Sequence, residues 1–228
     1  MFPHAFNFTI WYNIFMRNIF SKSSDIRNSA IVGFVIAALF LILYRTTIKE
    51  LAPYYELPIY YWGSLVLFPA ISALGIFIIK DLVKKFGDKF SVFFQFYKFI
   101  LIGVLNTMLD LTVLNALITL TAISTGWQFS LFKGISFAFA IINSYFWNKL
   151  WTFKISGGVK AAEFSKFFVI SLVGLGINVG IASLLVNVIG SPGELREQLW
   201  ANIAAVSAIG FSTIWNFLGY KIFVFKKK

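Results

Sequence analysis

Six long apolar runs, separated by charged segments, constrain this chain more than any other feature of its sequence. The runs cover residues 29–44, 57–79, 96–120, 129–147, 164–189 and 199–218. A helix of about 20 apolar residues crosses the hydrocarbon of a bilayer, whereas an open strand there would leave its backbone unpaired. With 59% hydrophobic and 13% charged residues, the chain is not a soluble globular protein. The sequence therefore predicts an all-α integral membrane protein with six transmembrane helices.

The basic residues predict how these helices are oriented. Sixteen of the 20 Lys and Arg residues lie in the N-terminal segment, in the loops after the second and fourth runs, and in the C-terminal tail. Loops rich in Lys and Arg face the cytoplasm, so we expect a multi-pass protein of the cytoplasmic membrane with both termini inside. The net charge of +11 then reflects topology, and no nucleic-acid partner is expected.

The first 28 residues are aromatic but too often interrupted by polar residues to form a secretory signal. Bulky side chains recur at helical spacing, at Phe8, Trp11, Tyr12, Phe15 and Ile19. Such a segment favours the headgroup boundary. We therefore expect an interfacial helix before the first span.

The last four runs form two similar halves. Phe-x-Lys-Phe opens both halves, at 96–99 and 164–167, and the sequences Lys-Leu-Trp-Thr-Phe-Lys and Lys-Ile-Phe-Val-Phe-Lys close them, at 149–154 and 221–226. The offset is 68 residues at the start and 72 at the end. Two helical hairpins that begin and end on the same side would form a parallel repeat. Chance similarity between apolar segments is the alternative.

A family resemblance follows from the same residues. The Phe-x-Lys-Phe motif, then Gly103, Asn106 and Asp110 in one span, then a segment from Asn143 that leads into Lys149 and Trp151, resembles the GtrA-like family over about residues 96–226. The resemblance implies a four-helix membrane module at 91–228 that moves polyprenyl-phosphate-linked sugars for cell-surface polysaccharide synthesis or glycosylation. Residues 1–90, with the interfacial segment and two spans, are an N-terminal extension to this module.

Asp110 is the acid expected near the middle of the bilayer. It lies twelve residues beyond Lys98, or about 18 Å along a helix, and Asn106 shares its face. Intramembrane acids mark substrate or ion paths, so we expect a polar seam formed by Asn106, Asp110 and, at the repeat position, Asn178. A purely structural interhelical hydrogen bond is the alternative.

Lys133 lies about one turn inside its span. Its ammonium could snorkel outward or reach Asp110. We expect snorkelling, and keep the pairing with Asp110 as a hypothesis.

Four lysines fall at the inner ends of the repeat helices, namely Lys98, Lys149, Lys166 and Lys221. Basic pockets between helices bind anionic headgroups, so a lipid phosphate could bind here, although for any one of these lysines a role in topology alone is the favoured alternative. Amide side chains in or near the same layer could bind sugar or cap helices; they are Asn143, Asn148 and Asn216. Asn216 is one place off the repeat match to Asn143, and Tyr220 replaces the asparagine expected from Asn148.

The fifth span carries a stripe of small residues, with Gly174 followed by Gly176 and Gly180. The Gly-x-x-x-Gly spacing favours close helix packing. The chain has no cysteine and one histidine, and no motif of a hydrolase, metal site or nucleotide site. We therefore expect no enzyme activity, no cofactor and no metal.

Three functions remain open at this level. The first is translocation of a polyprenyl-phosphate-linked sugar among membrane lipids, downhill or ion-coupled. The second is a partner that anchors a membrane glycosyltransferase, with the first two spans as its docking surface. The third is a small-molecule or proton-coupled transporter. The sequence leaves the sugar, the polyprenol and any homo-oligomer undetermined.

Overall fold

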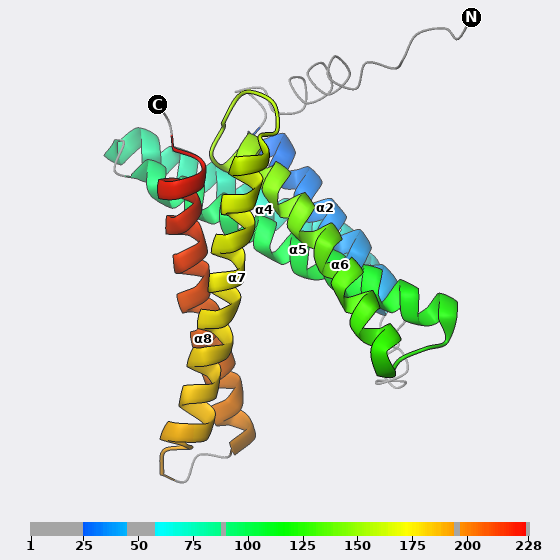
Figure 1. Ribbon diagram of the computed structural model, residues 1–228. Helices are drawn as coiled ribbons and strands as arrows, with labels where there is room; N and C mark the ends of the chain where they lie inside the picture. The colour runs from blue at the N-terminus through cyan, green and yellow to red at the C-terminus, as the bar shows by residue number, and fades with distance from the viewer. Residues whose placement is uncertain (1–24, 45–57, 88–89, 194–196, 227–228) are drawn as a thin grey trace, which may run out of the picture. The chain divides into compact units, whose positions relative to one another are not determined.

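The computed structural model describes residues 25–44, 58–87, 90–193 and 197–226 (Figure 1). This part of the chain is helical and contains no strand. Six of its helices are long and apolar enough to cross a membrane, which confirms the prediction of an all-α multi-pass membrane protein. The segment in which we expect an interfacial helix, around Trp11, lies outside the described residues.

The helices match the six apolar runs and extend beyond them. They are α2 (Asp25–Leu43), α4 (Pro58–Phe86), α5 (Ser91–Thr121), α6 (Gly126–Trp147), α7 (Ala161–Ser183) and α8 (Glu197–Gly219). Three of them continue as π-helical segments, η4 (Asn148–Thr152), η5 (Leu184–Ile189) and η6 (Tyr220–Val224). The helices outrun the apolar pattern because polar residues at a span end can stay helical in the headgroup layer.

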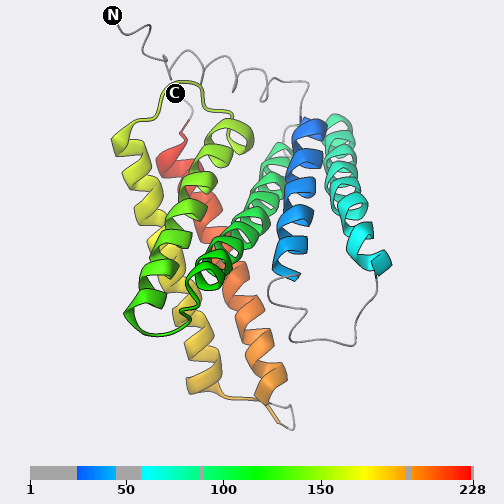
Figure 2. The same cartoon turned by 90° about the vertical axis from the view of Figure 1, so that its right-hand side faces the viewer.

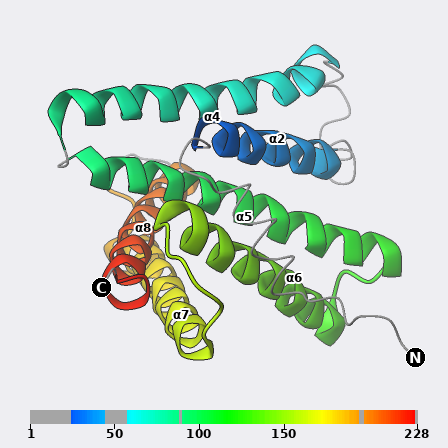
Figure 3. The same cartoon turned by 90° about the horizontal axis from the view of Figure 1, so that it is seen from above.

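The chain divides into two compact units between Lys154 and Ile155. The first holds α2, α4, the hairpin of α5 and α6, and η4, whereas the second holds the hairpin of α7 and α8 with η5 and η6. In the first unit, α2 lies between α4 and α5 (Figures 2 and 3). The domain boundary predicted at residue 90 concerns sequence similarity, and it stays a prediction.

One hydrophobic cluster joins the first two spans to the first hairpin. Its buried members come from four elements, namely Val32, Ile36, Ile76, Ile102, Leu105 and Trp151. Burying an aliphatic or aromatic side chain stabilises a contact by about 1.5–3 kcal/mol in water; in lipid, the gain comes from close packing instead. The extension before the repeat is thus an integral part of the first unit.

The contact between α2 and α4 depends on a glycine. A Cβ at Gly33 would lie 2.6 Å from the carbonyl oxygen of Phe68 and would also meet the Ser72 hydroxyl. That hydroxyl donates a 2.6 Å hydrogen bond to the same carbonyl, so the α4 surface has no room to give way. A larger residue at position 33 would force the two helices apart.

The predicted repeat is visible in the backbone of the two hairpins. The π-helical segments η4 and η6 stand 72 residues apart at both of their ends. Each closes with the same hydrogen bond, from the Phe153 amide to the Asn148 carbonyl at 2.9 Å and from the Phe225 amide to the Tyr220 carbonyl at 2.8 Å. The closing motif of each half therefore has one local structure.

Within the described residues of the second unit, Gly176 and Gly180 do not have the packing role expected of them. Both glycines are exposed, and a Cβ on either would meet no atom within 4 Å. Gly174 is the packed glycine, because a Cβ there would meet the Asn216 side chain of α8. The close approach of α7 and α8 thus uses two glycines, Gly174 at the level of Asn216 and Gly219, where a Cβ would meet the Ile170 side chain.

Candidate functional site

A buried carboxylate gathers the cations at one end of the first unit. Asp25, the first residue of α2, is 3% exposed. Its Oδ1 accepts a hydrogen bond from Lys98 Nζ at 2.6 Å and one from Trp151 Nε1 at 3.1 Å. Its Oδ2 lies 3.1 Å from Lys154 Nζ and 3.6 Å from Lys80 Nζ. Three ammonium groups around one carboxylate leave an excess charge of +2.

Lys98 therefore has an internal partner. Its side chain is 1% exposed, and its ammonium also lies 4.2 Å from the centre of the Phe94 ring. A buried ammonium is tolerated only when it is paired. The lysine that opens the first hairpin is thus neutralised by a residue of the N-terminal extension.

The other predicted residues of the inner layer of this unit lie in η4. Lys149 is buried, with Nζ 3.4 Å from the Tyr145 hydroxyl. Asn148 donates to the Ser144 carbonyl at 2.9 Å, and its buried Oδ1 has no hydrogen-bond partner in the described structure. The side chains of both residues are thus buried against other parts of the protein.

The predicted polar seam pairs across α5 and α6. Asn143 Nδ2 donates to Asn106 Oδ1 at 2.7 Å. One turn further along α5, Asp110 Oδ1 accepts a 2.6 Å hydrogen bond from the Ser136 hydroxyl. The structure therefore brings Asn106, Asp110 and Asn143 onto one helix interface.

Lys133 pairs with Asp110, which corrects the expectation that it snorkels. Its Nζ donates to Asp110 Oδ2. The lysine side chain is 46% exposed and the Asp110 side chain 20%. The inward arrangement is favoured because an unpaired carboxylate in the membrane would cost more than the bending of a lysine stem.

The two halves of this ion pair should respond unequally to mutation. Lys133→Ala leaves Asp110 charged within the span, at a cost of about 2.5–3.5 kcal/mol, or roughly 5–10 °C in melting temperature. Asp110→Asn should cost under about 1 kcal/mol, since the half-exposed lysine can turn outward. Melting temperatures in lipid nanodiscs measure both. Asp110→Asn combined with Lys133→Ala should recover most of the Lys133→Ala loss, and equal losses from the two single changes would contradict the asymmetry.

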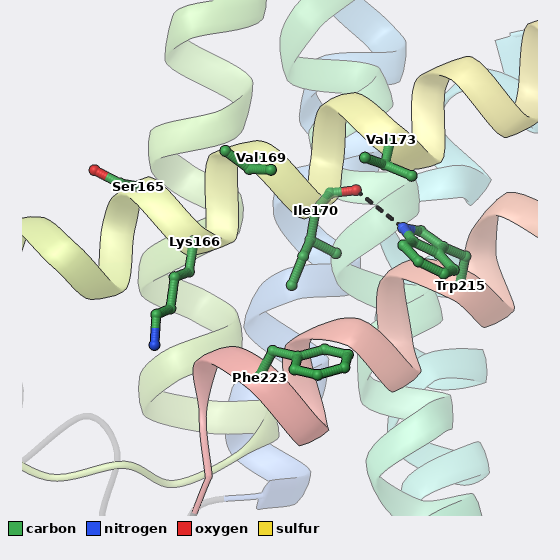
Figure 4. Close-up of a pocket in the computed structure, with 7 residues that line it drawn as sticks. All are labelled: Ser165, Lys166, Val169, Ile170, Val173, Trp215 and Phe223. Carbon is green, nitrogen blue, oxygen red and sulfur yellow. Dashed lines mark hydrogen bonds between the residues drawn. The ribbon is translucent and has the colours of Figure 1, made fainter.

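The second unit holds an open groove between α7 and the C-terminal part of α8 with η6 (Figure 4). It has a volume of about 500 Å³, and its lining residues are Ser165, Lys166, Val169, Ile170, Val173, Trp215 and Phe223. Figure 4 shows Ser165 and Lys166 at one end, and Val173 and Trp215 at the other. The groove thus combines an apolar wall with one cation.

A hydrogen bond between the two helices holds the walls of the open groove together. Trp215 Nε1 donates to the Ile170 carbonyl at 3.2 Å, which ties α8 to α7 beneath it. Among the described residues, no hydrogen bond or ion pair engages Lys166. Its ammonium is therefore available to an anion.

The remaining predicted residues of the second unit lie outside this groove. Asn178, the repeat equivalent of Asp110, donates to the Ser212 hydroxyl at 3.3 Å. Asn216 Oδ1 is buried without a hydrogen-bond partner in the described structure. Lys221 is half-buried, with its ammonium 5.7 Å from the centre of the Phe217 ring.

The open groove has a filled counterpart in the first hairpin. The offsets of 68 and 72 residues relate Lys166 to Lys98, Val173 to Leu105 and Phe223 to Trp151. Phe223 is 62% exposed but Trp151 only 1%, and Val173 is 43% exposed but Leu105 only 3%. The difference arises because α2 packs on the first hairpin.

Sequence reasoning missed Asp25 and its partners Lys80, Trp151 and Lys154. One signal was present in the sequence. Asp25 begins an apolar span at the end where the other spans carry lysines, which is an unusual place for an acid. Among the described residues, no group of three or more His, Cys, Asp or Glu side chains could hold a metal ion.

The comparison with known proteins gives one finding. Neither the curated proteins nor the solved structures that were compared with the chain give a match. A family model described as "GtrA/DPMS, transmembrane domain" matches residues 98–225, which are more than half of the chain and cover both hairpins from Lys98 onward, with all the site residues predicted above. The chain belongs to the GtrA/DPMS transmembrane family.

Proposed function

We propose that this protein translocates a polyprenyl-phosphate-linked sugar across the cytoplasmic membrane. The family places the chain among the membrane proteins of glycosylation and polysaccharide synthesis, which are generally not enzymes. In this proposal, the protein is a flippase without enzyme activity, and both of its termini lie in the cytoplasm. Its transport is downhill or ion-coupled, since the sequence has no nucleotide-binding motif.

The groove at Lys166 is the observation that carries this proposal. A polyprenyl phosphate has an anionic head and an apolar chain. Lys166 offers a compact positive charge for the phosphate, and Val169, Ile170 and Val173 continue from it as an apolar wall. From residue 166 to residue 173 the wall is about 10 Å long. Lys221 supplies a second cation in the same unit.

In this proposal, the paired amides and acid of the first unit supply polar groups for the sugar. Asn106 and Asn143 bond to each other, as do Asp110 and Ser136. Sugar hydroxyls can both donate and accept hydrogen bonds, so they can replace these partners one pair at a time. Each unit also contains a buried amide oxygen that lacks a hydrogen-bond partner in the described structure and could accept from a sugar, Asn148 Oδ1 in the first unit and Asn216 Oδ1 in the second.

The test is the movement of labelled polyprenyl-phosphate sugar in proteoliposomes. Lys166→Ala should slow movement about tenfold or more, because a charge-assisted hydrogen bond contributes about 1.5–3 kcal/mol. Lys160→Ala is the matched control, since it removes an exposed lysine just before α7 that does not line the groove. Equal rates in the native protein and Lys166→Ala would contradict the phosphate site. No movement by folded native protein would contradict the flippase.

A second candidate function has one specific observation in its favour. The counterpart of the open groove holds a transmembrane helix, α2, that begins with an acid. The open groove could hold a similar helix from a membrane glycosyltransferase, which this protein would then anchor. In that case native protein moves no lipid, and Lys166→Ala weakens co-purification with a co-expressed glycosyltransferase of the same membrane.

A further inference from the structure

The face of the first hairpin that corresponds to the open groove is covered by α2. Six of the seven residues that line the open groove correspond to residues of the first hairpin that lie in or against its buried cluster. The six counterparts are Tyr97, Lys98, Leu101, Ile102, Leu105 and Trp151. At these six positions the two hairpins thus differ in what covers this face.

The polar end of the covered groove is an anion site with an anion in it. The Asp25 carboxylate receives hydrogen bonds from Lys98, Trp151 and Lys154. Lys98 is the counterpart of Lys166, and Trp151 is the counterpart of Phe223. The carboxylate therefore lies against the lysine that corresponds to the free cation of the open groove.

The apolar part of the covered groove holds the side of α2 that continues from Asp25. Val32 and Ile36, at 0% and 3% exposure, belong to the same cluster as Ile102 and Leu105. Val32 lies seven residues after Asp25 and Ile36 eleven after it, spacings that keep all three on one helix face. An acid at one end and an apolar strip behind it give α2 the chemistry of an anionic amphiphile.

We infer that α2 is a tethered occupant of a second amphiphile site. Lys98, Lys154 and the Trp151 indole form a site for a phosphate anion, which the Asp25 carboxylate occupies, and Val32 with Ile36 take the place of an apolar chain. The first hairpin is closed to lipid phosphate as long as α2 is seated. The protein thus carries two related grooves, of which one is open to substrate.

The ligand class rests on the proposed function, whereas the occupation of the groove rests on the contacts of Asp25, Val32 and Ile36. Asp25→Ala removes the carboxylate and leaves three lysines around an empty space. A small phosphate anion added to the solution should bind there and restore stability. Because this experiment measures no transport, it can fail or succeed independently of the Lys166→Ala assay.

The experiment is a melting curve of full-length Asp25→Ala in detergent, titrated with inorganic phosphate at constant ionic strength. The melting temperature should rise by roughly 4–8 °C when phosphate is in about 30-fold excess over its Kd. Phosphate also stabilises proteins in general by exclusion from their surface. The native protein and the double variant Asp25→Ala with Lys98→Met report that general effect, and both should rise much less.

Dodecyl phosphate distinguishes a lipid headgroup from free phosphate. With Val32 and Ile36 still seated, the alkyl chain has no room, so dodecyl phosphate should raise the melting temperature of Asp25→Ala no more than inorganic phosphate does. A clearly larger rise, relative to the native protein, would overturn the statement that α2 fills the chain half of the site.

Equal phosphate responses in Asp25→Ala, the native protein and the double variant would overturn the anion site. If Asp25→Ala does not purify as folded protein, Asp25→Asn is titrated in the same way. Its amide fills part of the space but leaves Lys98 without a counter-charge. A rise confined to the variants that lack the carboxylate and keep Lys98 supports the inference.

Discussion

Asp25→Asn should lower the melting temperature more than any other single change in the cluster around it. The substitution keeps the shape of the side chain but removes the charge that neutralises Lys98, whose side chain is 1% exposed. Breaking a buried pair by removing one partner costs about 3–5 kcal/mol, or roughly 6–20 °C in melting temperature for a protein of this size. The loss should be visible in detergent and in lipid nanodiscs.

Substitutions of the other residues of the cluster should destabilise the protein less, and in a fixed order. Lys98→Met should cost less than Asp25→Asn, because Asp25 then keeps Lys154, Lys80 and the Trp151 indole. Lys80→Met should cost under about 1 kcal/mol, since its side chain is 33% exposed and its pair is long. Asp25→Asn with Lys98→Met should recover part of the single loss, as no buried charge is left unpaired.

Asp81→Asn is the matched control for Asp25→Asn. It makes the same chemical change at an exposed position next to Lys80 in α4 and should shift the melting temperature little. If Asp25→Asn were no more harmful than Lys80→Met or Asp81→Asn, the carboxylate would not be the centre of the cluster.

The six helices could be predicted from the sequence because a membrane span depends on its own residues. About 20 apolar residues are sufficient, and the run at 57–79 locates α4 without knowledge of its neighbours. The apolar run predicts the ends of a helix less well than its centre. The helix α4 continues through Lys80 to Phe86, since a lysine can keep its stem along the helix and its ammonium in the headgroups.

The candidate site was harder to predict because its decisive contacts are distant in sequence. Lys98 and Lys166 stand in the same motif and are indistinguishable from local pattern. What separates them is Asp25, which is 73 residues from Lys98 and 126 residues from Trp151. Only the packing of α2 against α5 tells a buried, neutralised lysine from an open one, and helix packing in a membrane leaves little trace in hydropathy.

Contacts of polar residues within the spans were harder to predict from the sequence than the spans themselves, but easier than the contacts of Asp25. The shared face of Asn106 and Asp110 follows from helical spacing, and both residues contact α6. The direction of the Lys133 side chain could not be predicted from helical spacing, because an inward and an outward rotamer fit the same position one turn inside the span. The outcome depends on the carboxylate across the helix interface, which no local rule includes.

Val173→Trp should abolish transport through the second unit. Val173 lines the open groove at the end away from Lys166, so an indole there would occupy the space proposed for the lipid chain, much as α2 occupies the equivalent space at Leu105. Because Val173 is 43% exposed, the larger side chain should not disturb a packed core. We expect the rate of polyprenyl-phosphate sugar movement to fall to that of protein-free liposomes, with the melting temperature almost unchanged.

Leu172→Trp provides a closely matched control. Leu172 is the preceding residue of α7, is also 43% exposed, and does not line the groove. A tryptophan there changes the apolar surface of the same helix by a similar amount, so the native rate should persist. Loss of transport in both variants would point to a general effect on α7, and native rates in both would exclude the groove as the path of the lipid. A loss confined to Val173→Trp locates the lipid chain on the apolar wall that continues from Lys166 to Val173.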